Sequence, residues 1–313
     1  MEVLKKYLRR FLGLFPYVSF LEERYEDLKM LSSEYGHAPG HFYSTIPALA
    51  DVERGLPKDR KSAKIEGIDI NLGFQKELLN HFREYYSEFP YECNSETATK
   101  HRYQVKDAYY RNADLVMLYS MMRHFKPSHV VEVGSGHSSA AMLDINELFL
   151  AGRTEFTFIE PFPENRLNSI FRSDDNKIAK VVIDIVQNVD LTLFQGLEEN
   201  DILFIDSSHV SKIGSDLNHL VFEVLPKLKK GVLIHFHDIF YPFELPDMWV
   251  KERKWYWNEN YLVRAFLMFN KDFEIVNFNS LLILNQENWF RENMPYCLLG
   301  KDGTGSIWLR KKK

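Results

Sequence analysis

The chain has 313 residues, of which 45% are hydrophobic and 27% are charged, and its formal net charge is −5. These values are typical of a globular protein with a sizeable core, and the negative charge argues against a dedicated nucleic-acid binder. Cys93 and Cys297 form no C-x-x-C pair, which predicts neither a zinc site nor a disulfide framework and favours a cytoplasmic location. The sequence has no run of 18 apolar residues and no signal-peptide pattern, so neither a transmembrane segment nor secretion is expected.

Residues 2–15 have the pattern of an amphipathic helix, with Leu4, Leu8 and Phe11 on one face and lysines and arginines largely on the other. The apolar face could pack on the rest of the protein or on a second copy in a homo-oligomer, which is the commoner use of such a face. It could instead make peripheral contact with an anionic membrane. A loop at 35–44 contains two histidines and three aromatic residues, and it either lines an acceptor pocket or packs on the protein.

Two further helices, at 74–88 and 108–124, are predicted from apolar residues at helical spacing. The second helix is followed by an apolar run at 130–133, whose β-branched valines favour a buried parallel strand. Gly134 and Gly136 then allow a tight turn and a close approach of the backbone to a ligand. A helix at 140–150, capped by one of the two serines before it, completes a strand-turn-helix unit typical of ligand-binding folds.

The sequence EVGSGHSS at 132–139 resembles the first motif of class I S-adenosylmethionine (SAM) dependent methyltransferases. The resemblance implies a Rossmann-like α/β fold with a seven-stranded, mostly parallel sheet. It places a SAM-binding domain at 106–313, after an N-terminal helical extension at 1–105 that would serve as the acceptor cap. In this family the glycines pass under the methionine part of SAM, and the acidic residue, here Glu132, helps to hold its ammonium group directly or through water. A nicotinamide or flavin fingerprint would instead require a third glycine where this chain has Ser139.

The later strands predicted for this domain also end in polar residues. Glu160 follows the second strand at 154–159, where an acidic side chain can accept both hydroxyls of a ribose. The third strand, at 179–185, ends near Asp184, which the resemblance would place at the adenine. The remaining predicted elements are strands at 201–206, 232–236, 273–278 and 306–310, helices at 191–197, 215–228 and 259–269, and an insertion at 288–299.

Asp206 ends the fourth predicted strand, and His237-Asp238 follows the fifth. In an open parallel sheet, ligands bind outside the carboxyl ends of the strands, so we expect these side chains to converge with Glu132 and Glu160. The His-Asp pair resembles a bacterial subgroup of class I methyltransferases. Metal-dependent O-methyltransferases, which are related, hold magnesium with acidic residues at these places, and Asp206, His237 and Asp238 match them one by one. Imidazole favours Mn, Fe, Zn or Ni over Mg.

His209 is the first candidate for a general base, because it lies three residues after Asp206, where those relatives carry a lysine base. A base is needed because the acceptor hydroxyl must lose its proton as it attacks the methyl group. His237 is the alternative base, and it would then not be a metal ligand. His235 is set back within the strand and is expected to be a packed core residue.

We therefore predict a SAM-dependent methyltransferase that O-methylates a small acceptor such as a sugar or a natural-product hydroxyl, with a divalent metal ion as an optional aid. Two alternatives stay open, a dinucleotide-dependent oxidoreductase and a non-catalytic subunit that binds SAM or a nucleotide. The predicted cofactor-binding residues are Glu132, Gly134, Ser135, Gly136, Ser138, Glu160, Asp184 and Asp206.

Overall fold

The computed structural model describes residues 17–21, 24, 25, 29, 36–91, 101–105, 108–299 and 304–313. The chain divides into two compact units, Met1–Leu56 and Pro57–Lys313. In the smaller unit the described residues include helix α3 (Leu49–Gly55) and a loop in which the rings of His37 and His41 stack with centroids 4.6 Å apart. The amphipathic helix predicted at 2–15 lies outside the described residues.

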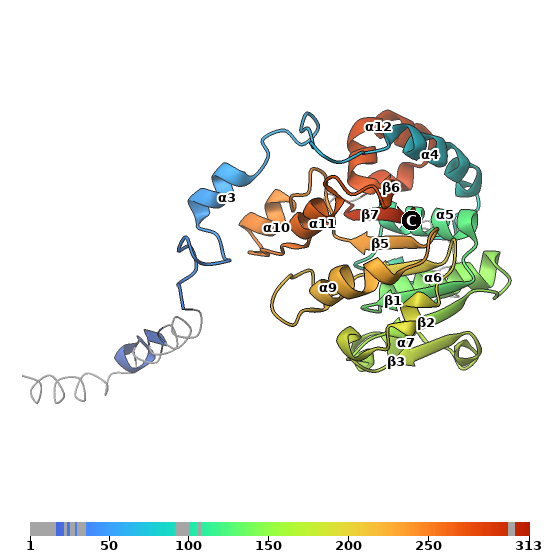
Figure 1. Cartoon of the computed structure of the whole chain (residues 1–313), viewed down its shortest axis with the longest axis horizontal. Coiled ribbons are helices and arrows are strands. Elements are labelled where there is room, and N and C mark those ends of the chain that lie inside the picture. Colours follow the sequence, from blue (N-terminus) through green and yellow to red (C-terminus); the bar gives the residue numbers. More distant parts are fainter. Residues whose placement is uncertain are drawn as a thin grey trace, which may run out of the picture. The chain divides into compact units, whose positions relative to one another are not determined.

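The larger unit is built on one seven-stranded sheet (Figure 1). The strand order is β3-β2-β1-β4-β5-β7-β6, and β7 runs in the direction opposite to that of the other strands in this sheet. This confirms the predicted Rossmann-like, mostly parallel sheet. The strands are β1 (His129–Val133), β2 (Glu155–Ile159), β3 (Ala179–Val182), β4 (Ile202–Ile205), β5 (Leu233–His237), β6 (Phe273–Phe278) and β7 (Ser306–Lys311).

Both faces of this sheet are covered, because alternate residues of each strand enter two different apolar cores. Val130 and Phe204 pack in the core shared with α4, α5 and α6, whereas Val131 and Leu203 pack in the core shared with α9 and α11. The helices of the larger unit are α4 (Leu72–Tyr86), α5 (Ala113–Phe125), α6 (His137–Phe149), α7 (Leu167–Ile170), α8 (Thr192–Gln195), α9 (Asp216–His219), α10 (Asp247–Lys251), α11 (Glu259–Leu267) and α12 (Asn279–Asn293).

Some predicted elements are shorter or begin elsewhere. α6 begins at His137, three residues before the predicted start, because the hydroxyl of Ser139 accepts the N–H of Gly136 at 2.9 Å and so satisfies a free donor at the helix start. β3 ends at Val182 rather than 185, and Asp184 consequently lies in the loop beyond the strand. The sheet edge therefore contributes fewer residues here than the sequence pattern predicted.

The helical segments at 215–228 and 279–298 differ from the prediction in helix type or in extent. The single helix predicted at 215–228 is α9 followed by a π-helical turn (Leu220–Val224) and a 3-10 turn (Leu225–Lys227). Pro226 lacks a backbone N–H and cannot continue a regular α-helix. The prediction of an insertion at 288–299 missed α12, which starts directly after β6, and the 3-10 helix Pro295–Leu298 that follows it.

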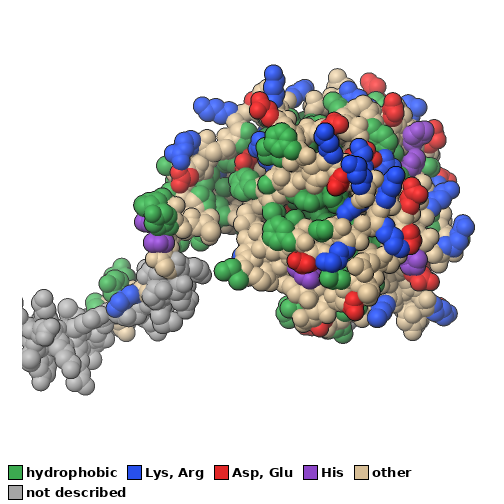
Figure 2. All heavy atoms as spheres, in the orientation of Figure 1, with side chains coloured by type: hydrophobic (Ala, Val, Ile, Leu, Met, Phe, Trp, Pro, Cys, Tyr) green, Lys and Arg blue, Asp and Glu red, His purple; other side chains and the backbone are tan. Residues whose placement is uncertain are grey.

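The surface of the protein carries both signs of charge. Figure 2 shows lysine and arginine side chains interspersed with aspartate and glutamate over the visible face. Within the part of the chain that the structure describes, we find no helix that is both long enough and apolar enough to span a bilayer.

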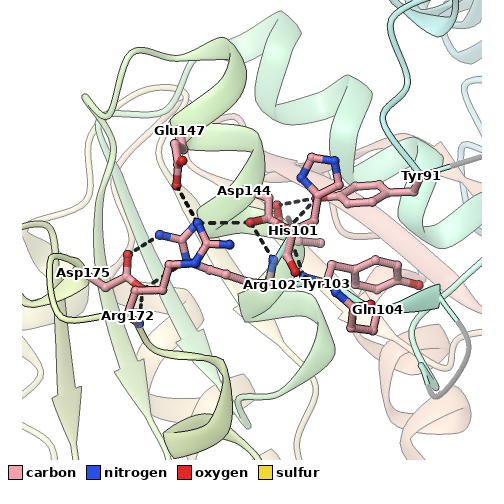
Figure 3. A network of polar contacts seen from close by, with 10 residues as sticks. Tyr91, His101, Arg102, Tyr103, Gln104, Asp144, Glu147, Arg172 and Asp175 are labelled. Atoms are coloured by element: carbon pink, nitrogen blue, oxygen red, sulfur yellow. Dashed lines mark hydrogen bonds and ion pairs between the residues drawn. The ribbon is translucent and has the colours of Figure 1, made fainter. Parts of the chain in front are cut away.

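A buried arginine joins the segment before α5 to the rest of the domain (Figure 3). Arg102 is 6% exposed and donates to both carboxylate oxygens of Asp175, at 3.0 and 2.5 Å. Its guanidinium also donates to Asp144 at 3.1 Å and to Glu147 at 2.6 Å, both on α6. Asp144 and Asp175 are themselves buried, so Arg102 compensates two carboxylates that have lost most of their hydration.

Replacing this arginine should cost much of the stability of the domain. We expect Arg102→Met to lower the free energy of unfolding by about 3–5 kcal/mol, because it leaves Asp144 and Asp175 buried without their cation. Denaturant unfolding of the purified protein measures this. The matched control is Arg291→Met, which breaks an exposed pair with Glu287 on α12 and should cost less than about 1 kcal/mol. Equal losses in the two variants would contradict the assignment.

Candidate active site

The turn after β1 requires a glycine at its first position. Gly134 has φ +83°, and a Cβ there would lie 1.8 Å from the backbone oxygen of Asp206, so no other residue fits. The N–H of Gly134 donates to the carbonyl of Ile159 at 3.1 Å, and the N–H of Asp206 donates to that of Val133 at 3.0 Å. The ends of β1, β2 and β4 therefore meet at this turn.

Glu132 supports the same turn from inside the protein. It is fully buried in β1, and its carboxylate accepts from the hydroxyls of Ser138, at 2.5 Å, and Ser139. Ser139, which stands where a dinucleotide fingerprint has its third glycine, thus links the backbone of Gly136 to Glu132. Burial raises the pKa of Glu132 to about 8, against the lowering effect of the two serine hydroxyls. Glu132 therefore holds a proton at neutral pH.

Glu160 lies directly after β2 and faces the glycine turn. One carboxylate oxygen accepts the N–H of Ser135 at 3.1 Å, and the other accepts the N–H of Phe162 at 2.9 Å. These two bonds fix the carboxylate, and each oxygen retains a lone pair for a ligand. The hydroxyl of Ser135 is buried and has no hydrogen-bond partner among the described residues.

A cluster of one imidazole and three carboxylates lies beyond β4 and β5. His209 Nε2 is 3.5 Å from Asp206 Oδ1 and 3.6 Å from Asp238 Oδ2. On the other side of the ring, His209 Nδ1 is 2.7 Å from Glu259 Oε2. One histidine therefore bridges acidic groups from three separate segments of the chain.

The charges in this cluster shift one another's protonation. Burial opposes ionisation of Asp206, but the nearby His237 and His209 outweigh it and lower the pKa of this carboxyl to about 2. Burial also disfavours the charged form of His209, yet Asp206, Glu259 and Asp238 together hold its pKa well above the ordinary value. For Asp238 burial prevails over the two histidines and raises the pKa to about 6. The nearby acidic groups thus favour the imidazolium form of His209, although burial raises the pKa of Glu259 as well.

His237 is the last residue of β5 and lies beside this cluster. Its Nε2 is 3.5 Å from Asp238 Oδ1, and its ring centroid is 4.9 Å from that of Tyr110. His235, two residues earlier, is fully buried and stacks on Phe204 with centroids 3.9 Å apart, and it lines neither of the two cavities described below. Its position agrees with the predicted packed core residue.

The predicted metal ligands Asp206, His237 and Asp238 line one cavity, but they do not form a recognisable metal-binding group. Among the described residues, no three histidine, cysteine, aspartate or glutamate side chains are grouped so as to hold a metal ion. His209 Nε2 lies next to Asp206 and Asp238, where a cation bound by both carboxylates would have to lie. The residues as placed do not fit a metal, and metal binding by Asp206, His237 and Asp238 stays a prediction.

One cavity of about 630 Å³ unites most of the predicted residues. Small-molecule sites typically have volumes of roughly 300–1,000 Å³. Glu132 is separated from the cavity by Ser138, because the cavity wall includes the serine and not the glutamate. The predicted residues in the wall are Gly134, Ser135, Gly136, Ser138, Glu160, Asp206, His209, His237 and Asp238.

A second cavity, of about 390 Å³, adjoins the first at the glycine turn and is lined in part by residues 185–187. Asp184 is not in its wall. This aspartate is exposed, and its Oδ1 accepts from the N–H of Ile185 at 2.7 Å and from Asn188 Nδ2 at 2.8 Å. By contrast, Gln187 lies in the wall with a buried side-chain oxygen that has no partner among the described residues.

Two acidic residues of the site, Asp114 and Glu259, were not predicted from the sequence. Asp114 lines the cavity and accepts from Ser306, at 2.6 Å, and from the N–H of Gly305, at 3.1 Å. Its signal was available, since it is the one acidic residue of helix α5, whose first two turns are otherwise mostly apolar. Glu259 gave no such signal, because an acidic residue at a helix start is expected from the helix dipole alone.

Comparison with known proteins agrees with this architecture. A family model described as "Methyltransferase domain" matches residues 131–239. An uncharacterized protein from Archaeoglobus fulgidus is 34% identical over 165 residues, which cover 52% of this chain and 74% of the relative.

Solved structures are similar at much lower identity. The O-methyltransferase TomG from Streptomyces achromogenes, in complex with SAM, is 13% identical, with 79% of this chain and 98% of TomG covered and a TM-score of 0.41. An O-methyltransferase from Bacillus cereus, in complex with SAH, is also 13% identical, with coverage of 84% and 96% and a TM-score of 0.39. Taken together, the matched domain, the 34% identical relative and the strand order show that the chain belongs to the class I SAM-dependent methyltransferases.

Proposed function

We propose that this chain transfers the methyl group of SAM to a hydroxyl of a small acceptor, such as a sugar or a natural product. The observation that supports this most strongly is the single cavity that joins the glycine turn, Glu160 and the His209 cluster. A cofactor site and a site for proton removal are both needed for O-methylation, and the residues that we propose for each line the same cavity.

SAM fits the groups around the glycine turn. We assign its methionine part to the backbone of Gly134 and Gly136 and to the unpartnered hydroxyl of Ser135. Glu160 would accept the ribose hydroxyls with the lone pairs that its two backbone bonds leave over. Ser138 can accept a hydrogen bond from the ammonium group while its own hydroxyl donates to Glu132, so that Glu132, which is neutral at pH 7, orients this serine.

The adenine is assigned to the second cavity. Gln187 Nε2 donates to the carbonyl of Gly214 at 2.8 Å, which fixes the amide, and the free side-chain oxygen can accept from the exocyclic amine of adenine. We therefore transfer the adenine contact predicted for Asp184 to Gln187. Asp184 would instead stabilise the loop by accepting from Ile185 and Asn188.

The His209 cluster would take up the proton of the acceptor. Bound SAM would supply an electrophilic methyl group on a sulfonium. As the acceptor oxygen forms its bond to this carbon and the S–C bond breaks, the hydroxyl proton passes to His209 Nε2. His209 must be neutral to receive this proton. The positive charge of the SAM sulfonium would lower the pKa of His209, against the effect of the three acidic groups that favour the imidazolium. His237 remains the alternative base, and Asp206, with its low pKa, stays ionised throughout.

The acceptor would bind against an aromatic wall. Trp249, Trp255 and Trp257 line the cavity, and the rings of Trp255 and Trp257 stack with centroids 4.6 Å apart. Such flat, rigid surfaces suit a ring-shaped acceptor. Arg60 braces the segment that precedes this wall, since it donates to the carbonyls of Glu244 and others at 241–245.

Arg60 belongs to the same compact unit as the carbonyls that it contacts, so an acceptor cap at 1–105 on a SAM-binding domain at 106–313 stays a prediction. The domain division, the cytoplasmic location, the homo-oligomer and the absence of a nucleic-acid partner stay predictions.

The cofactor assignment predicts tight SAM binding that depends on Glu160. In isothermal titration calorimetry, Glu160→Gln should weaken SAM binding about tenfold to a hundredfold, because a charge-assisted hydrogen bond contributes about 1.5–3 kcal/mol. The matched control is Glu164→Gln, which changes an exposed glutamate outside the cavity and should leave the affinity unchanged. Binding of NAD without SAM would contradict the proposal.

The same titration with EDTA, followed by a screen of hydroxylated acceptors for release of S-adenosylhomocysteine, tests the reaction and the metal. We expect SAM binding to persist in EDTA, because the assigned contacts are all to protein groups. Loss of turnover in EDTA, restored by a divalent ion, would show that a metal ion is needed and would support the predicted ligands Asp206, His237 and Asp238. Turnover that persists in EDTA would refute a role for a metal ion and leave His209, or His237 as the alternative, to take the proton without one.

The protonated state of Glu132 predicts a pH dependence of stability. Between its unfolded pKa of 4.5 and its folded pKa of about 8, the folded state holds a proton that the unfolded state lacks, so the free energy of unfolding falls as the pH rises. The glutamine of the Glu132→Gln variant cannot ionise. Between pH 5.5 and 8 the free energy of unfolding should therefore fall by about 3 kcal/mol less in this variant than in the wild-type protein. Urea unfolding at both pH values measures the difference, and equal losses in the two proteins would contradict it.

A further inference from the structure

The four residues Trp257 to Asn260, where the chain enters α11, contact both loops that form the proposed methyl-transfer site. One loop follows β4 and contains His209, and the other follows β5 and contains Asp238. These two residues have φ +60° and +56°, in the left-handed region that residues with a side chain rarely adopt. A backbone in this conformation persists only where its surroundings determine it.

The His209 loop is held by three consecutive residues. The ring of Trp257 stacks on that of His209, with centroids 4.5 Å apart and planes 27° apart. Asn258 accepts the N–H of Ser211 at 2.6 Å and donates to its carbonyl at 3.0 Å. Asparagine at this position commonly caps a helix, but here the side chain binds the loop and makes no cap hydrogen bond. The N–H of Glu259 donates to the carbonyl of His209 at 3.2 Å.

The Asp238 loop is held by the next residue. Asn260 is 2% exposed, and its Nδ2 donates to the carbonyl of Asp238 at 2.9 Å. Its side-chain oxygen accepts the N–H of Phe240 at 2.9 Å. One amide thus spans the turn on which Asp238 lies and fixes it relative to α11.

Glu259 determines which nitrogen of His209 faces the cavity. Its Oε2 is 2.7 Å from His209 Nδ1, which leaves Nε2 turned toward Asp206 and Asp238. The carboxylate is 1% exposed, and its second oxygen has no hydrogen-bond partner among the described residues. A carboxylate buried with so few partners is costly for folding, so its place beside His209 needs a reason other than stability.

We propose that the segment 257–260 is the positioning unit of the methyl-transfer site. Glu259 binds Nδ1 of His209 and thereby presents Nε2 to the acceptor. Asn260 fixes the backbone of Asp238, and with it the position of this aspartate relative to His209. Neither residue touches the reacting atoms in this account. The inference rests on the proposed function, and it adds the residues through which α11 sets the geometry of the proposed base.

The state of the His209 ring tests this inference without any acceptor. In nitrogen-15 NMR of the full chain, with His209 assigned from a His209→Gln variant, we expect Nδ1 to carry a hydrogen-bonded proton at every pH. In Glu259→Gln this preference should be lost, so that the proton moves in part to Nε2 once the ring is neutral. The control Glu287→Gln, on the exposed face of α12, should leave the His209 signals unchanged.

Kinetics with an acceptor found in the screen give the second readout. Glu259→Gln should lower kcat about tenfold to a hundredfold, the usual cost of removing a group that orients a functional histidine, with the KM for SAM unchanged. Asn260→Ser should act in the same direction and provides an independent variant if the first folds poorly. Unchanged His209 signals together with unchanged kcat in Glu259→Gln would overturn the inference. If the wild-type protein methylates no acceptor, the proposed function fails, and the histidine spectrum alone decides the positioning.

Discussion

The contact on which the site depends is the close approach of the Gly134 turn to the backbone of Asp206. It exists because β1 lies between β2 and β4 in a parallel arrangement, so the three strands end at the same edge. A Cβ at Gly134 would lie 1.8 Å from the Asp206 oxygen, and the approach therefore depends on a residue without a side chain. The glycine turn, Glu160 and Asp206 then share one wall, although they are far apart in sequence.

At this edge of the sheet, two neighbouring carboxyl groups have pKa values shifted in opposite directions. Glu132, withdrawn behind Ser138, is protonated at neutral pH because it is buried, whereas Asp206 is ionised because two histidines lie near it. Such divergent pKa values among neighbouring carboxyls are typical of sites that handle protons. The strained backbone at His209 and Asp238 is concentrated in the same place. Charge, strain and cavity thus coincide at the proposed methyl-transfer site.

The sequence predicted most of the sheet and the half of the site that lies on strand ends. Valine runs, glycines and terminal acidic residues are local signals, and they correctly located the edge where Glu160, Asp206 and Asp238 meet. Asp184 was expected near the end of the third strand, but β3 stops two residues before it and its side chain lies outside the cavity wall. Glu259 was not foreseen, since its contact with His209 spans 50 residues and depends on how α11 packs, which no local pattern encodes.

The most direct test of the account is a crystal structure of the protein with S-adenosylhomocysteine. We predict that the amino-acid part of the ligand lies over the turn at 134–136, with the ribose on Glu160 and the sulfur directed toward His209 and Asp238. A ligand bound elsewhere, or bound with its sulfur directed away from His209, would contradict the claim that one edge of the sheet holds both the cofactor and the reacting groups.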